Sequence, residues 1–272
     1  MQIKQLLSNT AFIHSWKSLD KKFVHVLFFD YLYSLFFLLI GSFFWYRVLP
    51  LFGSVLDSAK GLQSAQVFSS TQDFLSTVQG IGTQWSMFKW YSLGAFALIF
   101  VDYVLFKYLV WRTLQKKQES FSQFSKHLGL FAVVNLAVVL FYVLVLVASW
   151  YMFVLETFNI MFFFVVPLLL LFTMNLVHPI FVQKPQLSVC FSSFWNIGLK
   201  NFHRWIIPHL LLLLGALLIM EFVQLFLFLP DVVYFFWYVL CFAAYFCWAK
   251  YYIFAVLEKI QNKIKKSPLK DR

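Results

Sequence analysis

The sequence predicts an all-α fold: a polytopic integral membrane helix bundle of six transmembrane helices, arranged as three hairpins with interfacial amphipathic helices. Composition is the first indication. Of 272 residues, 62% are hydrophobic and 12% are charged, and the mean hydropathy of +0.78 excludes an ordinary soluble domain. The second indication is that the apolar residues fall in blocks of roughly 20 to 25, the length that a helix needs to cross about 30 Å of hydrocarbon.

The apolar blocks define the domain organisation along the chain. The predicted spans cover residues 23–47, 89–112, 128–152, 160–183, 205–228 and 232–255. Residues 1–22 are expected to form a cytoplasmic amphipathic segment, and the first block is too long for a cleaved signal sequence, so we expect it to be retained as a span. Residues 256–272 are expected to form a basic amphipathic tail.

The basic residues indicate how these spans are oriented. Nineteen Lys and Arg residues lie in the N-terminal segment, in the connections after the second and fourth spans, and in the tail. The other side carries only three, Arg47, Lys60 and Lys89. By the positive-inside rule, this bias predicts a protein of the plasma (inner) membrane with both termini in the cytoplasm.

Amphipathic segments are expected to accompany the spans. In the connection over residues 48–88, apolar residues recur with helical spacing at 51–62 and again at 74–81, so we expect two amphipathic helices that lie on the outer leaflet or cap the bundle. A shorter segment precedes the fifth span, and its apolar stripe comprises Phe191, Phe194, Trp195, Leu199 and Phe202. Helices of this kind commonly lie in the membrane interface.

The tail has a similar pattern with more charge. Ile253, Leu257, Ile260 and Ile264 form one helical stripe, and the basic residues off that stripe are Lys259, Lys263, Lys265 and Lys266. We expect these lysines to contact anionic lipid headgroups on the cytoplasmic side; a helix that binds a membrane protein partner is the alternative. The net charge is +11, but the basic residues lie mostly at one set of span ends. This distribution indicates contact with anionic lipid headgroups, and no nucleic-acid partner is predicted.

Polar residues within the spans are candidates for a functional site, because an ionised side chain at the bilayer centre costs roughly 2.5–3.5 kcal/mol on insertion scales. The predicted polar cluster consists of Asp30, Asp102, Asn135, Asn175, His178 and His209, all in the cytoplasmic halves of their spans. Asp30 and Asp102 occur in matched contexts, Phe-Asp-Tyr-Leu and Val-Asp-Tyr-Val, at similar predicted depth.

Three interpretations of the two aspartates remain open. In the structural one, they bond Tyr, Asn or His across helices, or pair with Lys107 or Lys250. In the second, they form a transport or proton-relay path, which uses acid, His and Asn at one depth. In the third, two carboxylates share a proton in an intramembrane hydrolase. However, the Gly-x-Gly-Asp motif of intramembrane aspartyl proteases is missing at Asp102, where the sequence reads Ile-Phe-Val-Asp.

Other catalytic and cofactor signatures are absent from the sequence. It contains no HExxH, GxSxG, P-loop or GxGxxG pattern, so neither a metal nor a cofactor is predicted. Cys190, Cys241 and Cys247 lack metal spacing and are expected to be reduced packing residues. Enzyme activity is therefore not expected.

One segment resembles a known group of membrane proteins. Residues 186–220 begin Gln-Leu-Ser-Val-Cys-Phe-Ser-Ser-Phe-Trp-Asn-Ile-Gly-Leu-Lys-Asn-Phe and continue into an apolar span. This pattern is similar to the later repeat of uncharacterised six-helix families related to the membrane domain of glycerophosphodiester phosphodiesterases. The resemblance implies a membrane domain without catalytic residues of its own, and it carries no site residue over.

Together these observations favour a structural or partner-binding membrane component. A small carrier or permease that uses the Asp30 and Asp102 region is the alternative, and an intramembrane hydrolase is the second alternative.

Overall fold

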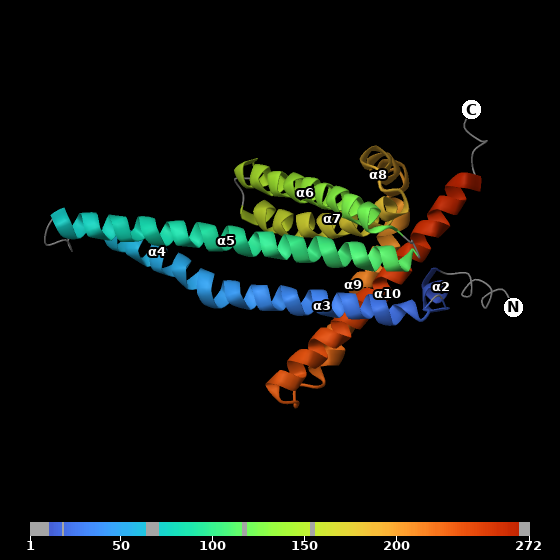
Figure 1. The fold of residues 1–272 in the computed structure, drawn as a ribbon, viewed down its shortest axis with the longest axis horizontal. Helices are drawn as coiled ribbons and strands as arrows, with labels where there is room; N and C mark the ends of the chain where they lie inside the picture. The colour runs from blue at the N-terminus through green and yellow to red at the C-terminus, as the bar shows by residue number, and fades with distance from the viewer. Residues whose placement is uncertain (1–10, 18, 64–70, 116–118, 153–155, 267–272) are drawn as a thin grey trace. The chain divides into compact units, whose positions relative to one another are not determined.

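A computed structural model describes residues 11–17, 19–63, 71–115, 119–152 and 156–266, and every regular element in these ranges is a helix (Figure 1). In chain order the helices are α2 (Ala11–Lys17), α3 (Lys22–Phe43), the π-helix η1 (Phe44–Val48), α4 (Leu49–Gln63), α5 (Thr71–Leu114), α6 (Phe121–Met152), α7 (Glu156–Gln183), α8 (Leu187–Ser193), the π-helix η2 (Phe194–Leu199), α9 (His203–Gln224) and α10 (Asp231–Lys266). Six helical stretches within the described residues are long and apolar enough to cross a membrane. The prediction of an all-α membrane bundle is confirmed.

The helices of the first hairpin are longer than the predicted spans. The first apolar stretch runs from Lys22 to Gly61, because η1 joins α3 to α4 without a break. In η1 the Leu49 N–H bonds the Phe44 carbonyl, five residues back, and Pro50, which has no N–H, follows directly. The helix therefore continues through Pro50 into α4, although this proline donates no backbone hydrogen bond.

The predicted helices of the 48–88 connection are present, but the second one is not separate. α5 is one helix from Thr71 to Leu114, so residues 74–81 continue directly into the span. No proline interrupts the sequence between Thr71 and Leu114, and helical hydrogen bonding therefore propagates through its polar first turns.

The chain forms two compact units, residues 32–103 and residues 1–31 with 104–272. In the unit of residues 32–103, aromatic and polar contacts join the two arms of the first hairpin. The Phe52 and Phe88 ring centroids lie 5.1 Å apart, and Ser54 Oγ donates to Gln84 Oε1 over 3.3 Å.

In the larger unit, α6 packs against α7 and α9 packs against α10 as two further hairpins (Figure 1). Tyr142 OH donates to the Leu169 carbonyl over 3.0 Å and joins the first pair. In the second pair, Tyr245 OH donates to the Leu212 carbonyl. A Cβ atom at Gly215 would lie 2.9 Å from the Tyr245 ring, so a larger residue at 215 would displace this ring at the helix crossing.

The second half of α10 is the core of the larger unit. Its residues 251–257 are buried except Phe254, which is half-buried. α2 packs against α10, where the Trp16 and Trp248 rings stack 5.4 Å apart and the Phe12 ring meets Trp248 edge-on. Residues 1–10 of the predicted N-terminal amphipathic segment lie outside the described residues.

Three of the four residues in the apolar stripe of the predicted tail are buried in the protein. Ile253, Leu257 and Ile260 are 2%, 0% and 4% exposed. α10 contacts α7 and η2 as well as α2 and α9, so these three residues pack on protein, whereas Ile264, the fourth residue of the predicted stripe, is 40% exposed. Helical periodicity is the same for both environments, and only the tertiary packing distinguishes them.

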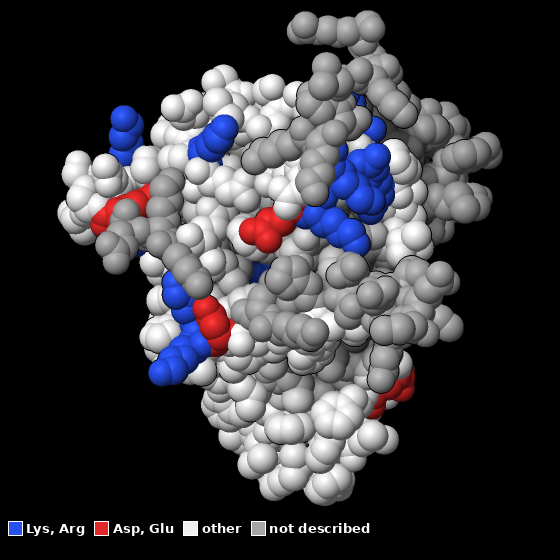
Figure 2. Space-filling view, turned by 90° about the vertical axis from the view of Figure 1, so that its right-hand side faces the viewer, with Lys and Arg blue, Asp and Glu red and all other residues white. Residues whose placement is uncertain are grey.

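Outside this core, the helix surfaces are largely apolar. Most of the described residues on the face drawn in Figure 2 are neither acidic nor basic. Of the residues of α9, Trp205, Leu212 and Val223 are buried, whereas Ile207, Leu210 and Leu218 are exposed. Such a surface is stable in hydrocarbon and unstable in water.

Candidate functional site

Asp30 lies at the centre of a buried ion cluster formed by three helices. Its side chain, on α3, is 3% exposed. Lys107 Nζ, from α5, lies 3.3 Å from Asp30 Oδ1, and Lys250 Nζ, from α10, bonds Asp30 Oδ2. Each carboxylate oxygen therefore has its own ammonium group. We call Asp30, Lys107 and Lys250 the Asp30 cluster.

An apolar cluster lies directly beside these charges. Val26, Val110, Cys247 and Tyr251 pack together, and all but Tyr251 are 0% exposed. Val26, Val110 and Cys247 lie one helical turn from Asp30, Lys107 and Lys250 respectively, on the same faces of α3, α5 and α10. The ion cluster is therefore poorly hydrated, and the attraction between its charges is strong, as is the penalty for removing one partner.

The pairing agrees with the structural interpretation made from the sequence, in which Lys107 or Lys250 reaches Asp30. Both lysines do so. Asp102 is also buried, but it belongs to the unit of residues 32–103, whereas the Asp30 cluster lies entirely in the larger unit. The predicted pairing of the two aspartates in one site therefore remains a prediction.

Asn135 and His178 form a second buried polar contact, between α6 and α7. His178 Nε2 lies 2.7 Å from Asn135 Oδ1, and Asn135 Nδ2 donates to the Phe131 carbonyl over 2.7 Å. Because the Asn135 amide group donates to Phe131, its oxygen accepts from His178, so Nε2 carries the proton of that imidazole. The Phe131 ring covers the imidazole at 4.9 Å. This arrangement is a satisfied core contact.

The two remaining residues of the predicted cluster have separate environments. His209 Nδ1 lies 2.9 Å from the Trp205 carbonyl, one turn earlier in α9, and its ring packs on Phe172 at 4.9 Å. Asn175 lies on α7 and is half-buried. The structure thus brings Asn135 and His178 into direct contact and gives His209 a partner in its own helix.

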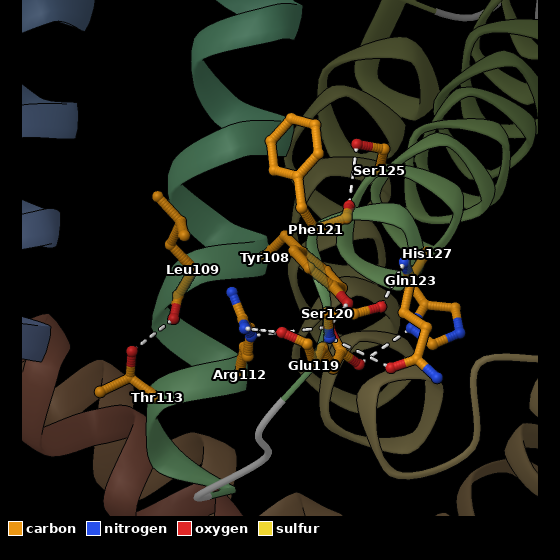
Figure 3. A network of polar contacts seen from close by, with 10 residues as sticks. All are labelled: Tyr108, Leu109, Arg112, Thr113, Glu119, Ser120, Phe121, Gln123, Ser125 and His127. Atoms are coloured by element: carbon orange, nitrogen blue, oxygen red, sulfur yellow. Dashed lines mark hydrogen bonds and ion pairs between the residues drawn. The ribbon is translucent and has the colours of Figure 1, made fainter.

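The structure also shows a cluster that the sequence analysis missed. Glu119, in the connection between α5 and α6, has a side chain only 2% exposed (Figure 3). Tyr108 OH donates to Glu119 Oε2 over 2.8 Å, Arg112 Nε lies 3.5 Å from the same oxygen, and His127 Nδ1 lies 2.9 Å from Oε1. We call these four residues the Glu119 cluster.

A local motif positions Glu119 at the start of α6. The Ser120 N–H donates to Gln123 Oε1 over 3.2 Å, and the Gln123 N–H donates to Ser120 Oγ over 3.3 Å. This reciprocal pair is a capping box, with the sequence Ser-x-x-Gln. The sequence does contain the relevant signal, because Glu119 is the single acidic residue between Asp102 and Glu156 and directly precedes this motif.

The structure describes the side chains of two of the four tail lysines. Lys259 and Lys263 are exposed, as headgroup contact requires, and the side chains of Lys265 and Lys266 lie outside the described residues.

Among the described side chains, no group of three or more His, Cys, Asp and Glu residues is arranged to hold a metal ion. Comparisons of the chain with protein-family models, with curated proteins and with solved structures find no match.

Proposed function

We propose that this integral membrane protein is a structural, partner-binding component of the plasma membrane, with both termini in the cytoplasm. The observation that supports this role is the closure of the Asp30 cluster. A carboxylate that is 3% exposed and bonded to two lysines joins three helices, whereas a transport path needs access for its ion. The excess of basic residues on one side of the predicted spans supports the orientation.

Further features agree with this proposal. The exposed apolar surface of α9 is available to lipid or to the helices of a membrane protein partner. Contacts of anionic headgroups with Lys259, Lys263, Lys265 and Lys266 belong to the same proposal, and the exposure of the first two supports them. The resemblance of residues 186–220 to membrane domains without catalytic residues also favours a non-enzymatic role.

Asp30→Asn distinguishes this role from that of a carrier. The variant keeps the size of the side chain but removes the charge that two lysines share. We expect the wild-type protein, reconstituted in vesicles with an internal pH-sensitive dye, to add no proton flux under an imposed potential. We expect Asp30→Asn to lower the midpoint of unfolding in mixed micelles, because two ammonium groups lose their counter-charge.

Two outcomes would contradict the proposal. The first is a wild-type flux that Asp30→Asn abolishes while stability is unchanged, since this indicates a carrier. The second is an Asp30→Asn variant as stable as the wild type, since the cluster would then have no structural role. Lys259→Gln is the matched control, because it removes one charge from an exposed position.

A further inference from the structure

The segment between α7 and α9 presents an exposed apolar face beside exposed basic residues. Phe191, Trp195, Leu199 and Phe202 are 46%, 57%, 42% and 43% exposed. The same stretch of chain carries three exposed basic residues, Lys200, His203 and Arg204. We call these seven residues the 191–204 surface.

The opposite side of the same segment is fixed against the protein. Cys190 is 0% exposed, with its Sγ 3.8 Å from the Val177 carbonyl of α7, and burial raises the pKa of its thiol to about 12. A Cβ atom at Gly198 would lie 3.1 Å from the Leu176 side chain, so the helix lies close against α7. The 191–204 surface therefore points away from the protein in a fixed orientation.

The turn that carries the basic residues is also held by hydrogen bonds. Asn201 Nδ2 donates to the Asn196 carbonyl over 2.7 Å, and Trp205 Nε1 donates to the Ile197 carbonyl over 3.1 Å. Trp205 itself is 0% exposed. Lys200 and Arg204 thus project from a preorganised turn, which lowers the entropy lost when they bind an anion.

The length and charge of the segment indicate the kind of surface that it meets. α8 and η2 together form an apolar helix over Leu187–Leu199, which at 1.5 Å per residue is about 20 Å long and too short to cross the hydrocarbon. Residues 157–220 contain no Asp or Glu, while Lys184, Lys200 and Arg204 are basic. An aromatic face beside basic residues, in a stretch of the chain without acidic ones, is complementary to the boundary between acyl chains and anionic headgroups.

We infer that the 191–204 surface binds the phosphate group of an anionic phospholipid through Lys200 and Arg204, with Phe191, Trp195 and Leu199 lying against its acyl chains. The tail lysines have a smaller apolar face beside them, because Ile253, Leu257 and Ile260 are buried and Ile264 is the one exposed member of that stripe. This inference rests on the membrane-spanning character of the chain and is independent of the role proposed for the Asp30 cluster.

The test uses the purified full-length protein, stripped of lipid and titrated with phosphatidylglycerol or with phosphatidylcholine. Lipid retained by the protein is counted by native mass spectrometry. We expect the wild type to retain phosphatidylglycerol in preference to phosphatidylcholine. K200Q/R204Q should weaken phosphatidylglycerol binding about thirty-fold, from roughly 1 kcal/mol for each basic residue, and R47Q/K60Q, the charge-matched control at two exposed positions with no proposed lipid contact, should bind like the wild type.

Trp195→Ser tests the apolar half of the surface separately. It should weaken the binding of both lipids while the preference for phosphatidylglycerol persists, because Lys200 and Arg204 remain. All the substituted side chains are exposed, so the fold should persist, and circular dichroism and gel filtration check that it does. Equal retention of the two lipids by the wild type, unchanged binding by K200Q/R204Q, or an equal loss in R47Q/K60Q would each overturn the inference.

Discussion

Asp30 and Glu119 are both buried carboxylates with cationic partners, but they are assembled in different ways. The side chains are 3% and 2% exposed. The lysines that bind Asp30 lie 77 and 220 residues away in the chain, whereas the partners of Glu119 lie 7 to 11 residues away. The Asp30 cluster therefore requires three helices to be in place, and the Glu119 cluster requires only the connection between α5 and α6.

The charges of the two clusters also differ. Asp30 is the counter-charge for two ammonium groups that are 15% and 9% exposed. Glu119 accepts from a hydroxyl group, an arginine that is 25% exposed and a histidine. Loss of the Asp30 carboxylate leaves two charges in a poorly hydrated site, whereas the guanidinium group beside Glu119 can be hydrated. The difference indicates that Asp30 contributes to global stability and Glu119 to local order.

The largest expected effect comes from Asp30→Leu. We expect the free energy of unfolding to fall by about 3–5 kcal/mol, because Lys107 and Lys250 remain buried without a counter-charge. Titration of the protein with sodium dodecyl sulfate in mixed micelles, followed by circular dichroism, measures the change.

A triple variant shows whether the effect comes from the unpaired charge. Asp30→Leu with Lys107→Met and Lys250→Met removes the whole cluster, and we expect it to recover most of the lost stability, since apolar replacement of a buried ion network is often nearly neutral. A triple variant no more stable than Asp30→Leu would show that side-chain shape, and not charge, controls stability at this site.

A smaller effect is expected at Glu119. Glu119→Gln keeps a carbonyl oxygen for Tyr108 but removes the negative charge facing Arg112, so we expect a loss of about 1–3 kcal/mol. Hydrogen exchange should show faster opening at the start of α6, while exchange around Asp30 stays unchanged. Faster exchange spread equally over α3 and α10 would contradict the local character of the Glu119 cluster.

The smallest effect is expected at the capping box. Ser120→Ala removes one of its two hydrogen bonds and should cost about 1 kcal/mol, with exchange again confined to the first turn of α6. Ser125→Ala is a matched control, because Ser125 Oγ donates to the Phe121 carbonyl within the same helix but caps nothing. If the control cost as much as Ser120→Ala, the capping role assigned to Ser120 would be wrong.

The candidate residues differ in how well the sequence predicts them. Asp30 is recognisable as a polar residue at membrane depth, with Lys107 and Lys250 as partners, because helix periodicity and depth limit which charges can meet. Glu119 is not recognisable in this way, since a single acid in a basic connection has no periodic signal. For the tail, the sequence predicted headgroup contact by its lysines, with a partner-binding helix as the alternative; of the apolar stripe beside them, Ile253, Leu257 and Ile260 are buried and Ile264 is exposed.

The sequence alone determined the fold class, the six membrane-length apolar stretches and the positions of the rare charges, because the length of an apolar block and the cost of burying a charge are local properties. Only the tertiary structure decided which face of a helix meets protein and which meets lipid, since both environments select apolar residues with the same spacing. It likewise decided that one carboxylate is shared by two lysines, because that contact depends on how three helices, distant in the chain, pack together.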